Sequence, residues 1–139
     1  MYHKRNRYEK NYLALDPGKK HTGVAISLQG ALPLALETLN LPVKKQISRI
    51  LKIIKDNQIN HLIVGRIKNQ SHSEQISFTE KYIQALKKQI PTDLKIIVFN
   101  EDFTSKLAQR LQPNKNLAHA QAAQIILQDW LKINNNMFP

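Results

Sequence analysis

Several residues that can bind a metal ion stand where apolar segments of the chain end. Asp16 follows a short apolar run and precedes a Pro-Gly pair, which is typical of turns. Glu101 and Asp102 follow a second apolar run, and His119 lies near the start of the last helical pattern. The N-terminus of a helix disfavours the imidazolium, and neutral imidazole is the form that binds metal. Together these residue types indicate a cation site.

Carboxylates contributed by distant parts of a sequence repel each other when they meet, unless a cation lies between them. Oxygen ligands with open positions favour Mg²⁺ or Mn²⁺. In a basic protein, such ions commonly activate water for attack on a phosphodiester. We therefore predict a hydrolytic site in which Asp16, Glu101 and His119 are both catalytic residues and metal ligands, with Asp102 as a reserve ligand.

Each of these residues also has a purely structural interpretation. Asp16 can serve as a turn residue. Glu101 and Asp102 can cap the helix that follows them, because negative charge is favourable at a helix N-terminus. His119, taken alone, can be a structural histidine at a helix start. The hydrolytic prediction therefore depends on whether the fold brings these residues together.

The elements that must position these residues follow from the apolar patterns, which predict five strands and four helices. Two Gly-containing turns, at Pro17-Gly18 and Gln29-Gly30, join the first strands into hairpins. Pro33 favours a sheet edge for the third strand, because proline cannot donate a hydrogen bond to a neighbour. The predicted strands are 13–15, 21–28, 32–39, 61–65 and 94–99, and the predicted helices are one after Pro42, one from Ser73, 103–111 and 117–133.

Right-handed crossovers place the fourth and fifth strands beside the first, on the side away from the hairpins. The prediction is an α/β fold of three layers, with a mixed five-stranded sheet of order 3-2-1-4-5 and helices on both faces. Ligands bind beyond the carboxyl ends of the parallel strands in such sheets. Those ends carry Asp16, Gly65 and residues 100–102.

The last helix is expected to pack on the sheet through one apolar stripe, formed by Ala122, Ala123, Ile126, Trp130 and Ile133. Its small alanines would allow a close approach, and His119 shares this face. We therefore expect His119 to come near Asp16.

Length and composition limit the class of protein. The 139 residues fit one domain, for which we expect a basic arm at 1–10, a folded domain at 11–133 and a tail at 134–139. The chain has no cysteine and therefore neither disulfides nor thiolate metal sites. Neither an apolar run of about 20 residues nor a secretory signal is present, so we expect a cytoplasmic protein with no membrane partner.

The charge indicates a polyanionic partner. Lys and Arg total 21 against 10 Asp and Glu, which gives a net charge of +11. Such an excess attracts nucleic acid through its phosphates, although a basic surface without any ligand is the alternative. The residues expected in loops at the same rim, where they would hold phosphates, are Lys19, Lys20, Arg66, Lys68 and Lys115.

Four segments carry a resemblance to a known family. DPGKKHTGVAIS, LIVG, NEDFTS and AHAQAAQIILQDWL resemble, in order and spacing, the motifs of the YqgF (RuvX) family of RNase H-like proteins. The resemblance extends from about Tyr12 to Leu131. The first motif is shared with RuvC-type resolvases, whereas Ala-Ala-x-x-Ile-Leu-Gln is more particular to YqgF. The resemblance implies an RNase H-like fold, metal-dependent cleavage of structured RNA and 5′-end maturation of 16S ribosomal RNA.

The resemblance also implies roles for single residues. Asp16 matches the family's first catalytic aspartate, and Glu101 matches the glutamate of its Asp-Glu-Arg-x-Thr-Thr motif. His119 stands where the family has its last catalytic aspartate. Asn100 and Asp102 replace the aspartate and arginine that flank the motif's glutamate.

A further departure follows Gly65, where Arg66-Ile67-Lys68 replaces the usual Leu-Pro pair. With these departures, a catalytically impaired RNA-binding or ribosome-assembly module is one alternative. A DNA Holliday junction resolvase, acting as a dimer, is a second. An actin-like or sugar-kinase ATPase domain is a weaker third, because the chain lacks a second lobe. The sequence leaves open whether the protein is a monomer or a homodimer.

Overall fold

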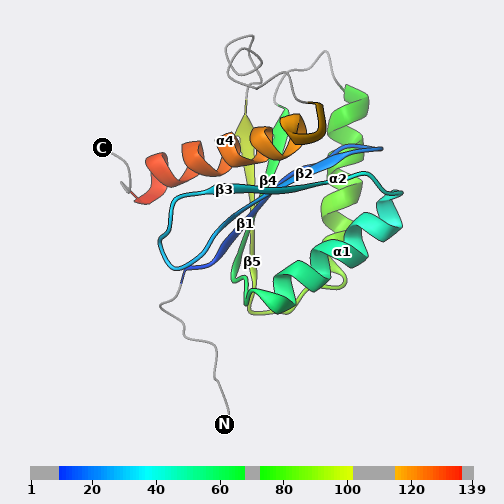
Figure 1. Cartoon of the computed structure of the whole chain (residues 1–139). Helices are drawn as coiled ribbons and strands as arrows, with labels where there is room; N and C mark the ends of the chain where they lie inside the picture. Colours follow the sequence, from blue (N-terminus) through cyan, green and yellow to red (C-terminus); the bar gives the residue numbers. More distant parts are fainter. Residues whose placement is uncertain (1–9, 68–72, 102–114, 136–139) are drawn as a thin grey trace.

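The computed structural model describes residues 10–67, 73–101 and 115–135. The strands are β1 (Tyr12–Asp16), β2 (Thr22–Ser27), β3 (Leu34–Leu39), β4 (His61–Ile67) and β5 (Lys95–Glu101), and the helices are α1 (Val43–Asp56), α2 (Ser73–Lys87) and α4 (Lys115–Asn135). Helices cover both faces of one mixed sheet (Figure 1). Its order, β3-β2-β1-β4-β5, confirms the predicted topology.

The central strand β1 is buried on both faces, which explains its uninterrupted apolar sequence. Side chains alternate along a strand, so Leu13 and Leu15 join the core beneath α1 and α2. Tyr12 and Ala14 join the core beneath α4. The strand pairs with β2 in antiparallel fashion and with β4 in parallel fashion.

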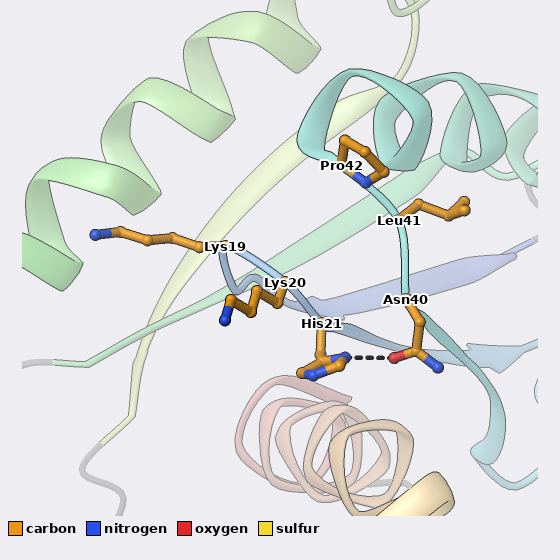
Figure 2. Close-up of a pocket in the computed structure, with 6 residues that line it drawn as sticks. All are labelled: Lys19, Lys20, His21, Asn40, Leu41 and Pro42. Carbon is orange, nitrogen blue, oxygen red and sulfur yellow. Dashed lines mark hydrogen bonds between the residues drawn. The ribbon is translucent and has the colours of Figure 1, made fainter.

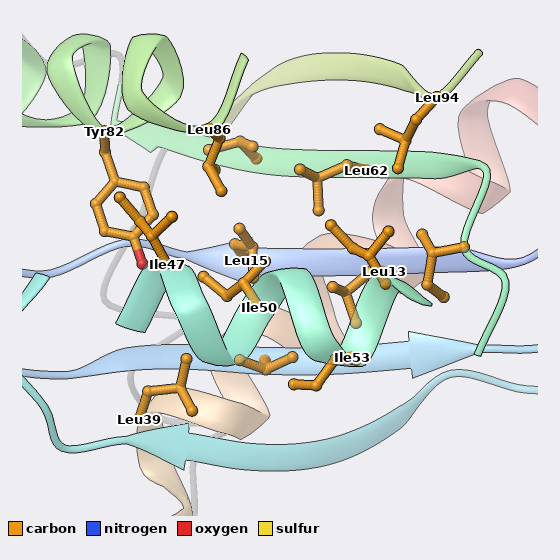
Figure 3. Packing of buried hydrophobic residues seen from close by; sticks show 14 of the residues in the cluster. Leu13, Leu15, Leu39, Ile47, Ile50, Ile53, Leu62, Tyr82, Leu86 and Leu94 are labelled. Atoms are coloured by element: carbon orange, nitrogen blue, oxygen red, sulfur yellow. The ribbon is translucent and has the colours of Figure 1, made fainter. Parts of the chain in front are cut away.

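The larger core lies between the sheet and the pair α1 and α2 (Figure 3). Ile47, Ile50 and Ile54 of α1 are buried at helical spacing, as the pattern predicts. From α2, Ile83 and Leu86 complete this core. Burial of each such side chain stabilises the fold by roughly 1.5–3 kcal/mol.

Helix α4 covers the other face through Ala123, Ile126, Leu127 and Leu131. Ile133 was expected in this stripe, but it is 69% exposed. Since seven residues return a helix to nearly the same face as Ile126, the exposure means that the last turn of α4 extends beyond the sheet (Figure 1).

Several boundaries differ from the prediction. Strands β4 and β5 run on through Ile67 and Glu101, because the parallel ladder continues to that pair. Arg66 therefore lies on a strand, not in the expected loop. Lys115 was also expected in a loop, but α4 begins there. The predicted helix 103–111 and residues 1–9 of the arm lie outside the described residues. None of the described helices is long and apolar enough to cross a membrane.

Candidate active site

Asp16 lies at the carboxyl end of β1, opposite Gly23 of β2. The residue keeps part of its surface exposed, yet burial of its carboxyl group raises the pKa to about 7. Within the described part of the chain, no hydrogen bond or charged group offsets this burial. A carboxyl group left in this state is unfavourable as an anion and can gain stability from a bound cation.

A tight turn connects Asp16 to β2. A Cβ atom on Gly18 would lie 2.3 Å from the carbonyl oxygen of His21, so the turn requires glycine at this position. The backbone N–H of Gly18 donates a hydrogen bond of 3.1 Å to Thr22 Oγ1. These contacts fix the path of the chain directly after the candidate ligand.

A buried polar network supports this turn from the side of α1 and α2. The Gln46 amide donates to the carbonyl oxygens of Gly18 (3.3 Å) and Leu41 (2.8 Å). Its Oε1 accepts hydrogen bonds from Thr22 Oγ1 (2.6 Å) and from the Tyr82 hydroxyl (2.7 Å). Gln46 is fully buried, and burial raises the pKa of Tyr82 to about 12. Three elements are thereby tied to the turn.

The first turn of α4 lies against β2 beside Asp16. A Cβ atom on Gly23 would lie 1.8 Å from the carbonyl oxygen of His119, so only glycine permits this approach. Because Gly23 is the register partner of Asp16, the backbone of His119 lies next to the end of β1. The predicted proximity of α4 to Asp16 is therefore present.

The His119 side chain is half-buried and stacks on His21, with ring centroids 5.1 Å apart and an interplanar angle of 27°. Burial, and then the neighbouring His21, lower the pKa of His119. The ring is therefore neutral at physiological pH, which is the form that binds metal.

His21 and its partner Asn40 were missed by the sequence analysis. His21 Nδ1 is hydrogen-bonded to Asn40 Oδ1 (Figure 2). Since an amide oxygen only accepts, Nδ1 of His21 is the donor in this contact. The signal for His21 was present in its position within the turn after Asp16, but nothing in the sequence connects Asn40 with this turn.

Glu101 is the last residue of β5, where it pairs with Ile67. Because β4 separates β5 from β1, the backbones of Glu101 and Asp16 lie on strands about 10 Å apart. The side chain of Glu101, and Asp102 and Lys68 as a whole, lie outside the described part of the structure.

Two departures from the family pattern contact each other. Arg66 Nε donates a hydrogen bond of 2.8 Å to Asn100 Oδ1, across the β4–β5 ladder. The same guanidinium forms an ion pair with Glu80 of α2. Arg66 is thus engaged by protein side chains in this structure, whereas Lys19 and Lys20 project from the turn beside Asp16 (Figure 2).

The described donors partly meet the requirements of a divalent metal. Asp16 offers a buried carboxyl group without a cationic partner among the described residues. His119, whose backbone lies beside the end of β1, offers a neutral imidazole. Over the described ranges, no group of three His, Asp or Glu side chains is close enough to hold a metal ion. A complete set of metal ligands would therefore need a further donor, such as Glu101, whose side chain lies outside the described part of the structure.

The fold places the protein in a structural class. RuvC of Thermus thermophilus, solved in complex with a Holliday junction substrate, superimposes with a TM-score of 0.59 at 11% identity, covering 91% of this chain and 97% of that one. A second T. thermophilus RuvC structure gives 0.54 at 12% identity, covering 88% and 96%. The fold is therefore the RNase H-like fold of RuvC-type resolvases.

Sequence comparison identifies the family. Residues 10–133 match the family described as "RuvX: Holliday junction resolvase". A protein of Fusobacterium nucleatum is 37% identical over 134 residues, which cover 88% of this chain and 96% of that protein. A protein of Staphylococcus epidermidis is 33% identical over 135 residues, covering 86% and 93%. Both are named "Putative pre-16S rRNA nuclease". The chain belongs to the RuvX family.

Proposed function

We propose that this protein is a metal-dependent nuclease of the cytoplasm that cleaves the phosphodiester backbone of structured RNA. Its task in this proposal is the 5′-end maturation of 16S ribosomal RNA. The relatives are named as nucleases of pre-16S rRNA, and the 5′ end is what the family resemblance implies. The net charge of +11 favours a nucleic acid substrate. The observation that carries the proposal is Asp16, whose buried carboxyl group stands at the end of the central strand without a described cationic partner.

The proposed ligands are Asp16, Glu101 and His119, with Asp102 in reserve, and the metal is Mg²⁺ or Mn²⁺. Bound metal supplies an activated water and stabilises charge on the departing oxygen. Asp16 would release its proton when the ion binds, because a neutral carboxyl group is a poor ligand. His119 needs no such change, since burial already lowers its pKa.

For the lysines of the turn we keep the predicted role, which is to contact phosphates. Lys19 and Lys20 follow Asp16 closely enough to hold phosphates that flank the cleaved bond. Lys68 and Lys115 stay candidates on sequence grounds. Arg66 would have to leave Glu80 and Asn100 to contact RNA, so we expect its role to be structural.

A DNA junction resolvase is the second candidate. The family description and the likeness to RuvC favour it, and its chemistry would be the same. Cutting two strands of one junction would require two active sites, as in a homodimer. An RNA-binding module without activity is the third candidate, because of the departures at Asn100, Asp102 and His119.

Cleavage of end-labelled 16S precursor RNA and of a DNA four-way junction separates these functions. Each substrate is incubated with Mg²⁺, Mn²⁺ or excess chelator. We expect metal-dependent cutting of the RNA, no cutting in chelator, and loss of cutting in Asp16→Asn with RNA binding retained. Activity of Asp16→Asn equal to wild type would disprove the site, and cutting of the junction alone would favour the resolvase.

A second variant tests the departure at His119. His119→Asp restores the residue type that the family has at this position, and His119→Ala removes the donor. We expect His119→Ala to weaken Mn²⁺ binding, measured by calorimetry, by roughly tenfold or more. His61→Ala is the matched control, because His61 lies at the opposite end of β4 and its pKa is also lowered by burial.

A further inference from the structure

Two hollows flank Lys19 at the turn after β1. One has a volume of about 330 Å³ and lies toward the start of α1, where its lining residues are Lys19, Lys20, His21, Asn40, Leu41 and Pro42. The other has a volume of about 420 Å³ and is lined by Lys19, Ser77, Phe78 and Lys81. Figure 2 shows Lys19 extending from the turn toward α2. Both hollows are lined by this side chain, and together they are here called the Lys19 groove.

The α2 side of the Lys19 groove combines cations with an aromatic ring. Lys19 and Lys81 come from different elements, and no acidic residue is among the described residues that line either hollow. Neither ammonium group forms an ion pair with a described residue, and the nearby Glu80 is taken by Arg66. Two uncompensated cations in one hollow favour an anionic ligand.

Phe78 gives the groove a fixed aromatic surface. It is half-buried, packs against the core of α1 and α2, and contacts Tyr82 with ring centroids 5.7 Å apart. The turn on the other side is equally constrained, because Gln46 holds the carbonyl oxygen of Gly18. The two sides of the groove are therefore held by core packing and by hydrogen bonds.

We propose that the Lys19 groove binds a single-stranded segment of nucleic acid, with one base against Phe78 and its phosphates at Lys19 and Lys81. Aromatic faces with flanking cations are the usual means of holding an unpaired strand. A duplex hides the faces of its bases and cannot use Phe78 in this way. The inference rests on the proposed function for its substrate class and adds the path of the strand, from the turn after Asp16 toward α2.

Binding in excess chelator tests the groove without any cleavage. Fluorescence anisotropy would compare a labelled single-stranded RNA with a duplex of the same length. We expect Lys81→Gln to weaken single-strand binding about threefold to tenfold and to reduce the salt slope by about 0.7. Lys87→Gln, an exposed lysine at the end of the same helix, is the matched control and should change little.

Phe78→Leu should weaken single-strand binding by about tenfold with the salt slope unchanged, and leave duplex binding within about twofold. Phe78→Tyr should retain the wild-type affinity. Thermal unfolding would show whether Phe78→Leu remains folded, and Lys81→Gln provides a test that does not disturb the core.

Three results would overturn the inference. Equal losses in Lys81→Gln and Lys87→Gln would indicate general attraction to a basic surface. If Phe78→Leu is folded and binds single-stranded RNA as tightly as wild type, no base stacks on Phe78. If Phe78→Leu loses as much affinity for the duplex as for the single strand, the groove does not prefer single strands. None of these binding measurements uses Asp16→Asn or requires cleavage. The proposal for the Lys19 groove and the nuclease proposal can therefore fail separately.

Discussion

Asp16 combines a carboxyl group with surroundings that disfavour its charge. Burial raises its pKa to about 7, and no described charge compensates for it. Structural carboxylates usually gain hydrogen bonds or cationic partners that lower the pKa instead. This residue therefore makes the metal-free fold less stable than it would be with a neutral side chain. Such a residue is explained more readily by a ligand than by the fold.

The raised pKa predicts how stability depends on pH. At a pH well below 3.8, the ordinary pKa of an Asp carboxyl group, Asp16 is protonated in both the folded and the unfolded chain and has no effect on stability. As the pH rises, the unfolded chain ionises first and the folded state loses stability, until both are ionised above about pH 7. In chelator, Asp16 should lower the free energy of unfolding by on the order of 2 kcal/mol between about pH 5 and about pH 8.

Urea unfolding of wild type and Asp16→Asn at both pH values measures this contribution. Asn is neutral throughout, so the variant should lack that part of the pH dependence and be the more stable protein at the higher pH. Identical pH dependence in the two proteins would show that the carboxyl group is well solvated. Added Mn²⁺ should then stabilise wild type but not Asp16→Asn.

At the scale of elements, the turn after β1 is held by α1 and α2 together. Gln46 contacts the carbonyl oxygens of Gly18 and Leu41 and accepts from Thr22 and Tyr82. Four polar groups would lose a partner if this one side chain became apolar. A buried polar network whose members are all satisfied makes a core rigid and specific, whereas a group that loses its partner there is costly.

We expect Gln46→Met to lower the free energy of unfolding by about 2 kcal/mol or more, because it leaves several buried groups unsatisfied. Tyr82→Phe, which removes only one hydroxyl, should cost about 1 kcal/mol. Gln124→Met is the control, since the Gln124 amide donates a single hydrogen bond to Pro33. Equal costs for Gln46→Met and Gln124→Met would mean that the network contributes nothing beyond one bond.

The contact between α4 and β2 gives a second prediction for an element. A Cβ at Gly23 would overlap the backbone of His119, which cannot move without the whole helix. Gly23→Ala should therefore destabilise the fold by about 3 kcal/mol or more, or shift α4 away from the sheet. Gly30 has a positive φ of 79° but open space around it, so Gly30→Ala should cost only about 1 kcal/mol. Equal losses of stability in Gly23→Ala and Gly30→Ala would contradict the close approach of α4 to Gly23.

These elements also show how far sequence patterns reach. The strand order followed from hairpin turns and crossover handedness, and the core of β1 followed from its apolar run. Neither pattern contains the Gln46 network or the His21–Asn40 contact, because polar partners far apart in sequence have no periodicity. The burial of Ile133 was wrong for a related reason: a stripe predicts the face of a helix but not where the sheet beneath it ends.

The candidate site was predictable to a similar extent. The positions of Asp16 and His119 at one end of the sheet followed from topology. The contacts of Arg66 with Asn100 and Glu80 did not follow from topology. They depend on two further residues of strand pairing, which no local sequence pattern predicts. The proposed roles of Glu101 and Asp102 remain predictions.

For the whole molecule, the net charge of +11 determines how the protein meets a polyanion. Each phosphate that a lysine or arginine neutralises releases a counterion, so affinity falls with salt. The charge is unevenly divided, because residues 1–9 contain Lys4, Arg5 and Arg7 against the single acid Glu9. This arm would add to binding without taking part in cleavage.

We expect RNA affinity, measured in chelator, to fall by more than about tenfold between about 50 and about 200 mM salt. Deleting residues 1–9 should reduce the slope of log affinity against log salt by roughly one to two, while metal-dependent cleavage at saturating RNA stays within about twofold of wild type. A deletion that abolishes cleavage at saturating RNA would instead place the arm in the active site. An unchanged slope would show that the arm does not reach the substrate, and the charge that attracts RNA would then lie on the folded domain itself.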